Sequence, residues 1–208
     1  MDIIWEPQAI EKKSMEIIET FLSGYSWSPL EKAIVKRVIH TTGDPELVAA
    51  LRFHPDGAAS GLQALRAGRN LYTDVNMLKS GVNQGRLEKN GGEVFCAIKH
   101  PRVVEEARKH GITRAAAAMR LFGRELDACV VAIGNAPTAL FEVLNLIEQG
   151  IARPALIVGT PVGFVGAAES KAMLVEKSPV PYISLLGTRG GSPIAASIIN
   201  ALLYYEGN

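Results

Sequence analysis

The chain has little cysteine, and this scarcity excludes two classes of small stabilised fold. Its 208 residues include two cysteines, Cys96 and Cys129, which lie in apolar runs and form no C-x-x-C pair. A disulfide framework or a zinc knuckle needs more cysteines at closer spacing. We therefore expect both thiols to be free and buried.

Net charge and long apolar runs are also lacking. The formal net charge is +1 at pH 7, whereas a general nucleic-acid binder shows a basic excess, so we expect no nucleic-acid partner. No apolar run approaches the roughly 20 residues of a transmembrane helix, so we expect no membrane partner. The opening residues, MDIIWEPQAIEKKS, lack the basic and apolar segments of a secretory signal. The expected location is the cytoplasm.

Two common ligand-binding patterns are missing as well. The stretch VVAIGNAPTALFEV (130–143) reads as a buried strand, a turn and the start of a helix, but it lacks the G-x-G-x-x-G glycines of a dinucleotide site. The four histidines, at positions 40, 54, 100 and 110, have no spacing that places two on one helical face. We expect neither a nicotinamide cofactor nor a bound metal.

Apolar residues are plentiful, at 48% of positions, and can form a sizeable core. Residues 1–69 carry helix signals only. A helical periodicity of apolar and charged residues follows Pro7, and the letters SPLE (28–31) form a near capping box ahead of a second helix. Two further short helices are predicted to open at Asp44-Pro45 and Pro55-Asp56.

Residues 70–208 alternate short apolar runs with amphipathic segments. The runs are LYT, EVFCAI, ACVVAI, PALIVG and YISLLG. This alternation predicts an α/β fold, a mainly parallel five-stranded sheet flanked by helices in a three-layer, Rossmann-like arrangement. Together with the N-terminal helical part, we expect one α/β domain over residues 1–208.

The turns after the predicted strands are candidate binding elements, because ligands of such sheets bind at the carboxyl ends of the strands. Three turns are rich in small residues: GNAP (134–137), GTPVG (159–163) and GTRGGS (187–192). Each precedes a helix N-terminus, which favours anions. Any one of them is explained by a tight connection alone. Three along one edge suit a broad, flat ligand that carries several carboxylates.

Four longer segments carry a specific resemblance to a known family. They are GITRAAAAMRL (111–121), VVAIGNAPTALFE (130–142), PVGFVGAAESK (161–171) and RGGSPIAASIINAL (189–202). The chain resembles, over nearly its whole length, the precorrin-8X methylmutases of cobalamin biosynthesis, including the cobalt-precorrin-8 methylmutases.

The resemblance implies an isomerase that moves a methyl group between adjacent ring carbons of a contracted tetrapyrrole. The product would be hydrogenobyrinic acid or, with cobalt, cobyrinic acid. The resemblance also implies that no cofactor is needed and that the protein is a homodimer with sites near the interface. The apolar C-terminal helix, which ends in Tyr204 and Tyr205, is a candidate for that contact.

The resemblance assigns His40, in KRVIHTTG, as the catalytic histidine, which would protonate the macrocycle and take the proton back. The resemblance, the small-residue turns and the predicted N-cap threonine together indicate a set of substrate-binding candidates. These are Ser14, Arg37, Thr113, Arg114, Asn135, Gly163, Arg189 and Gly190.

Structural explanations stand beside these assignments. A protonated histidine at the end of a helix, as predicted for His40, interacts favourably with the helix dipole. Arg37 is explained equally well as a solvated helix residue, and the Ser14 hydroxyl by a bond to its own helix backbone. Two rival functions also remain open: a non-catalytic corrinoid carrier, and a nicotinamide-dependent reductase that rests on fold analogy alone.

Overall fold

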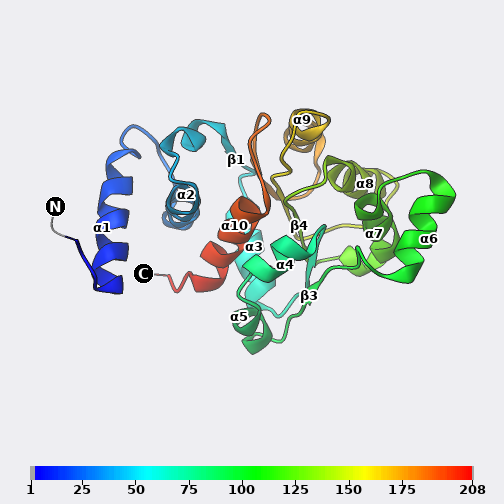
Figure 1. Cartoon of the computed structure of the whole chain (residues 1–208), viewed down its shortest axis with the longest axis horizontal. Coiled ribbons are helices and arrows are strands. Elements are labelled where there is room, and N and C mark those ends of the chain that lie inside the picture. Colours follow the sequence, from blue (N-terminus) through cyan, green and yellow to red (C-terminus); the bar gives the residue numbers. More distant parts are fainter. Residues whose placement is uncertain (1–2, 208) are drawn as a thin grey trace.

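The computed structural model describes residues 3–207 and confirms the α/β fold (Figure 1). Within this range six strands form one sheet in the order β1-β6-β5-β4-β2-β3. Five strands run parallel, and β1 pairs with β6 in the antiparallel direction. The strands are β1 (Leu51–Phe53), β2 (Leu71–Thr73), β3 (Val94–Phe95), β4 (Val130–Ile133), β5 (Leu156–Gly159) and β6 (Tyr182–Leu185).

The predicted number of five strands is wrong by one, and the missed strand is β1. It lies within residues 1–69, where the sequence shows helix signals only. Three residues are too few to display an alternating pattern, and β1 follows a 3-10 helix, η1 (Pro45–Ala50), instead of a βαβ crossover. An antiparallel edge strand on a parallel sheet is common. Through it the N-terminal region joins the sheet.

Helices cover both faces of the sheet, as expected for three layers. Successive strand residues point to opposite faces: Val130 and Ala132 contribute to one apolar cluster, and Val131 and Ile133 to the other. The first cluster is closed by α2 (Pro29–Thr42), α3 (Gly57–Arg66), α4 (Asn76–Gly81), α5 (Gln84–Lys89) and α10 (Ser192–Tyr204). The second is closed by α7 (Arg114–Phe122), α8 (Pro137–Glu148) and α9 (Ala167–Lys177), with η2 (Gly123–Leu126) following α7. Helix α6 (Pro101–His110) packs on α7.

The capping signals read from the sequence are confirmed at α2. The Ser28 hydroxyl accepts the Glu31 N–H at 3.3 Å, and the Glu31 carboxylate accepts the Ser28 N–H at 2.9 Å. Helix α2 packs along α10, whose apolar residues are thereby buried in the core. The suggestion that α10 forms a contact between subunits is therefore not needed to explain its composition, although Tyr204 at its end is exposed.

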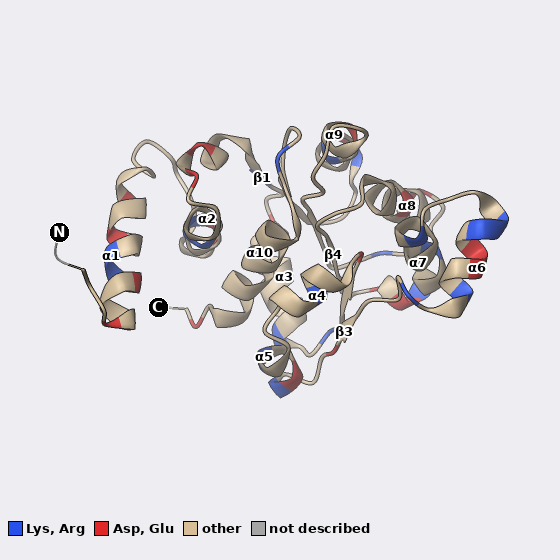
Figure 2. Ribbon diagram, viewed as in Figure 1, with Lys and Arg blue, Asp and Glu red and all other residues tan. Residues whose placement is uncertain are grey.

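Helix α1 (Pro7–Thr20) lies at one end of the long axis and packs against α2 (Figure 1). One side of α1 is apolar and only partly covered, since Ile10 and Ile17, and Phe21 directly after the helix, are each nearly half exposed. Charged residues of both signs are interspersed on α1 and α6 in Figure 2, in keeping with the small net charge. No helix within residues 3–207 is long and apolar enough to cross a membrane.

Candidate functional site

The three small-residue turns follow β4, β5 and β6 and are bonded to one another. The N–H of Thr160 donates to the Ile133 carbonyl at 2.9 Å, which ties the end of β5 to the end of β4. The N–H of Gly191 donates to the Thr160 carbonyl at 2.8 Å, and the N–H of Gly163 to the Thr188 carbonyl at 3.1 Å. Backbone hydrogen bonds thus join the three turns at the carboxyl ends of β4, β5 and β6, the sheet edge that the sequence predicted.

The turn after β4 is organised by Asp74, a buried residue for which the sequence pattern predicted no role. Its carboxylate accepts the N–H groups of Gly134, Asn135 and Ala136 at 3.1, 2.8 and 2.7 Å. Burial raises the pKa of Asp74, and the three N–H donors act in the opposite direction. These N–H groups are already occupied, so this turn offers them to no external anion. The visible signal was an acidic residue directly after β2, at the same sheet edge.

The glycines of this edge serve different purposes. A Cβ at Gly134 would lie 2.7 Å from the Ser192 Cα, so Gly134 permits the close approach of α10. A Cβ at Gly190 would clash with the carbonyl oxygens of Thr160 and Pro161. Gly163 differs, because it has φ +143° and no atom lies within 4 Å of its Cβ position. Of these glycines, Gly163 is the one that borders open space.

Arg189 and Lys171 meet at the turn after β6. The Arg189 guanidinium forms an ion pair with Asp44 and lies 3.7 Å from a Glu46 carboxylate oxygen. Its carbonyl accepts a hydrogen bond from the Lys171 ammonium at 2.6 Å. Lys171 is fully buried in α9, and burial lowers its pKa to about 8. The sequence segment PVGFVGAAESK contains this lysine, but its pattern does not reveal the contact.

Three of the predicted binding residues gather where α7 and α8 begin. Thr113 caps α7, as predicted, by accepting the Ala116 N–H at 3.2 Å. Its hydroxyl also forms a hydrogen bond with that of Thr138, 2.7 Å away in the first turn of α8. The side chains of Arg114 and Asn135 are exposed and make no side-chain hydrogen bond or ion pair to another described residue. Their polar groups face solvent.

Ser14 and His40 line one cavity of about 260 Å³ between α1 and the end of α2. The remaining lining is mostly apolar and consists of Ile17, Ile18, Phe21, Ile39, Gly43 and Pro45. His40 is exposed in the last turn of α2, three residues before the left-handed Gly43. The Ser14 hydroxyl donates to the Ile10 carbonyl at 2.9 Å, the backbone bond that the sequence left open as an alternative.

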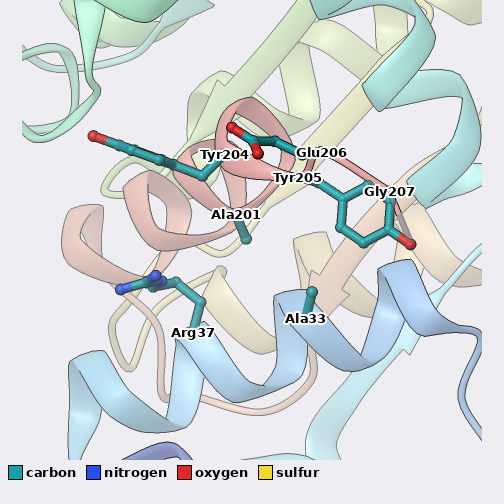
Figure 3. A pocket seen from close by; sticks show the side chains of 7 residues that line it. All are labelled: Ala33, Arg37, Ala201, Tyr204, Tyr205, Glu206 and Gly207. Carbon is teal, nitrogen blue, oxygen red and sulfur yellow. The ribbon is translucent and has the colours of Figure 1, made fainter. Parts of the chain in front are cut away.

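Arg37 does not line the cavity of His40, although it lies only three residues earlier. It lines a separate hollow of about 310 Å³ between α2 and the end of the chain. Figure 3 shows Arg37 pointing from α2 toward the turns of α10 that carry Ala201 and Tyr204. The guanidinium donates to the Glu11 carboxylate at 3.2 Å.

The predicted site residues therefore form separate groups within one chain. The cavity of Ser14 and His40 lies at the α1–α2 end of the long axis, and the group of Thr113, Arg114 and Asn135 lies in the other half of the molecule, at α7 and α8 (Figure 1). Arg189, in the turn after β6, is paired with Asp44, which lies between Gly43 and Pro45 of the His40 cavity.

Comparison with known proteins identifies the family of this chain. A family model described as Precorrin-8X methylmutase matches residues 9–205.

The chain belongs to the precorrin-8X methylmutase family.

Relatives within this family support the assignment over almost the full length. The chain is 44% identical to the cobalt-precorrin-8 methylmutase of Salmonella typhimurium, with 99% of this chain and 98% of the relative covered. It is also 44% identical to the precorrin-8X methylmutase of Pseudomonas aeruginosa, with 97% of each covered. The solved structure of a precorrin-8X methylmutase from Thermus thermophilus superimposes with a TM-score of 0.83 at 39% identity, covering 94% of this chain and 96% of that one.

As a member of the precorrin-8X methylmutase family, the protein is an isomerase of cobalamin biosynthesis. This confirms the enzyme class implied by the sequence resemblance. The corrinoid-carrier and reductase hypotheses are thereby set aside.

Proposed function

We propose that the protein moves a methyl group between adjacent ring carbons of precorrin-8X or cobalt-precorrin-8, with His40 as general acid and base. The products are hydrogenobyrinic acid and cobyrinic acid, respectively. Relatives named for each substrate match at the same 44% identity, so the proposal covers the ring chemistry that both share. The observation that carries it is the exposed imidazole of His40 in a largely apolar cavity.

The chemistry asks little more of the protein than one proton and a fixed geometry. His40 donates a proton to the macrocycle, the methyl group leaves one ring carbon and bonds to its neighbour, and the imidazole takes the proton back. The reaction is redox-neutral and consumes no second substrate. An imidazole titrates near neutral pH and can serve in both directions. The Ser14 hydroxyl lines the same cavity and can also accept a hydrogen bond from the substrate.

We also propose that the protein is a homodimer with its sites near the interface. A flat macrocycle in the His40 cavity would lie far from Thr113, Arg114 and Asn135 of the same chain, because the two groups occupy different halves of the molecule (Figure 1). A second copy can bring its α7–α8 end to this cavity. The partly covered apolar side of α1 provides surface for such a contact.

Replacing His40 tests the proposed acid. His40→Asn should leave folding and product binding intact, because the side chain is exposed and makes no hydrogen bond to another described residue. Turnover of precorrin-8X, followed by visible absorbance, should fall by at least about a hundredfold. His110→Asn, which changes an exposed histidine of α6, is the matched control and should keep full activity. Turnover of His40→Asn at the wild-type rate would show that another group supplies the proton.

Mixing two inactive variants tests the shared site. His40→Asn and Arg114→Ala should each be poorly active alone, whereas mixed dimers contain one site in which neither residue is changed. Subunit exchange should therefore restore activity toward a quarter of the wild-type value, the share of intact sites expected for random pairing. Sedimentation should show a dimer at micromolar concentration. A fully active monomer, or no recovery from mixed dimers, would contradict the proposal.

A further inference from the structure

Lys171 is unusual because a lysine side chain is rarely fully buried without a charged partner. It lies in α9, and its ammonium donates to the Arg189 carbonyl at 2.6 Å. Among residues 3–207 no carboxylate lies within ion-pair distance of it. Burying an unpaired charge carries a desolvation penalty, so this lysine is not explained by stability.

The contact fixes one particular peptide of the turn after β6. On either side of it, backbone bonds already hold Thr188 to Gly163 and Gly191 to Thr160. The Lys171 ammonium donates to the carbonyl of Arg189, which lies between these two bonds in the sequence and faces the protein interior. The side chain of the same residue, Arg189, leaves the turn outward and is about half exposed, with its guanidinium beside Asp44. Arg189 is therefore held at two points, its carbonyl by Lys171 and its guanidinium by Asp44.

We propose that Lys171 is a positioning residue for substrate binding, which orients the Arg189 guanidinium at the sheet edge to receive a carboxylate of the corrinoid. The inference rests on the proposed function and deepens it, since it assigns a cause to the orientation of one binding residue. Asp44 and Glu46 lie beside the guanidinium, and a substrate carboxylate would join or replace them.

The charge of Lys171 acts in the same direction as its hydrogen bond. Burial lowers the pKa of Lys171 to about 8, so the amine still carries its proton at neutral pH for most of the time. A cation behind the turn attracts an anionic substrate group in front of it, through protein rather than through water.

A double-mutant cycle tests this inference. The variants are Lys171→Met, Arg189→Ala and the two combined, with Lys177→Met on the exposed side of α9 as the control. Binding of hydrogenobyrinic acid is measured by absorbance titration, and turnover of precorrin-8X by initial rates. Lys171→Met and Arg189→Ala should each weaken binding by about tenfold, the effect of losing one charge-assisted hydrogen bond. KM should rise while kcat changes little.

The decisive result is the combined variant. If Lys171 acts mainly through Arg189, Lys171→Met causes a much smaller loss once Arg189 is alanine, because only the attraction between its charge and the substrate remains. An equal loss in both backgrounds would overturn the inference, as would wild-type binding by either single variant. If Lys171→Met does not fold, Lys171→Gln carries the same cycle, because its amide removes the charge and shortens the reach. Failure of the wild-type protein to bind or convert a corrinoid would refute the proposed function instead.

Discussion

Raising the pH from 8 to 10.5 should stabilise the protein against unfolding relative to its Lys171→Met variant. Burial lowers the pKa of Lys171 from 10.5 to about 8, so between these values the unfolded chain binds a proton that the folded protein has released. The free energy of unfolding then rises with pH. The difference between the two pKa values corresponds to about 3 kcal/mol across this window. Below pH 8 both states are protonated and the penalty is constant.

Urea unfolding at several pH values, followed by circular dichroism, measures this difference. At pH 7 the variant loses the hydrogen bond to the Arg189 carbonyl but also the buried charge, so the two proteins should differ by roughly 1 kcal/mol or less. Comparison with Lys177→Met removes the contribution of other groups that titrate near pH 10. A stability difference that stays constant from pH 7 to 10.5 would show that the Lys171 amine is solvated and would refute the reasoning.

Two other side-chain changes separate structural roles from binding roles at the sheet edge. Asp74→Asn should lower the free energy of unfolding by roughly 2 to 4 kcal/mol, because an amide cannot accept all three N–H groups of the turn. Urea unfolding measures this loss, and a change below about 0.5 kcal/mol would show that Asp74 does not stabilise the turn. Gly134→Ala should lower the melting temperature, since its Cβ would collide with Ser192, whereas Gly163→Leu should mainly weaken corrinoid binding in absorbance titrations. An unchanged affinity in folded Gly163→Leu would count against a ligand at this turn.

Local signals predicted much of the fold. The capping box at Ser28, the N-cap at Thr113 and the alternation of apolar runs with amphipathic helices all depend on residues close in sequence, and the structure confirms them. Strand β1 was missed because its identity depends on pairing with β6, not on its own three residues.

The candidate site was less accessible from sequence, because its contacts join distant segments. Asp74 occupies the N–H groups of a turn sixty residues later, and no local pattern at Gly134 signals that they are taken. In a similar way Lys171 of α9 bonds to Arg189, eighteen residues later and after the end of β6. Arg37 and His40 lie only three residues apart in α2, yet the neighbouring α1 and α10 place them in separate hollows.

The antiparallel pairing of β1 with β6 has a consequence for synthesis on the ribosome. Leu51 emerges long before its partner Leu185, and α10, the helix that covers α2, emerges after β6. The parallel strands between them can assemble in the order in which they emerge. The apolar side of α2 therefore stays uncovered until the residues of α10 have been synthesised. Strand β1 therefore pairs later than the parallel strands that follow it in the sequence.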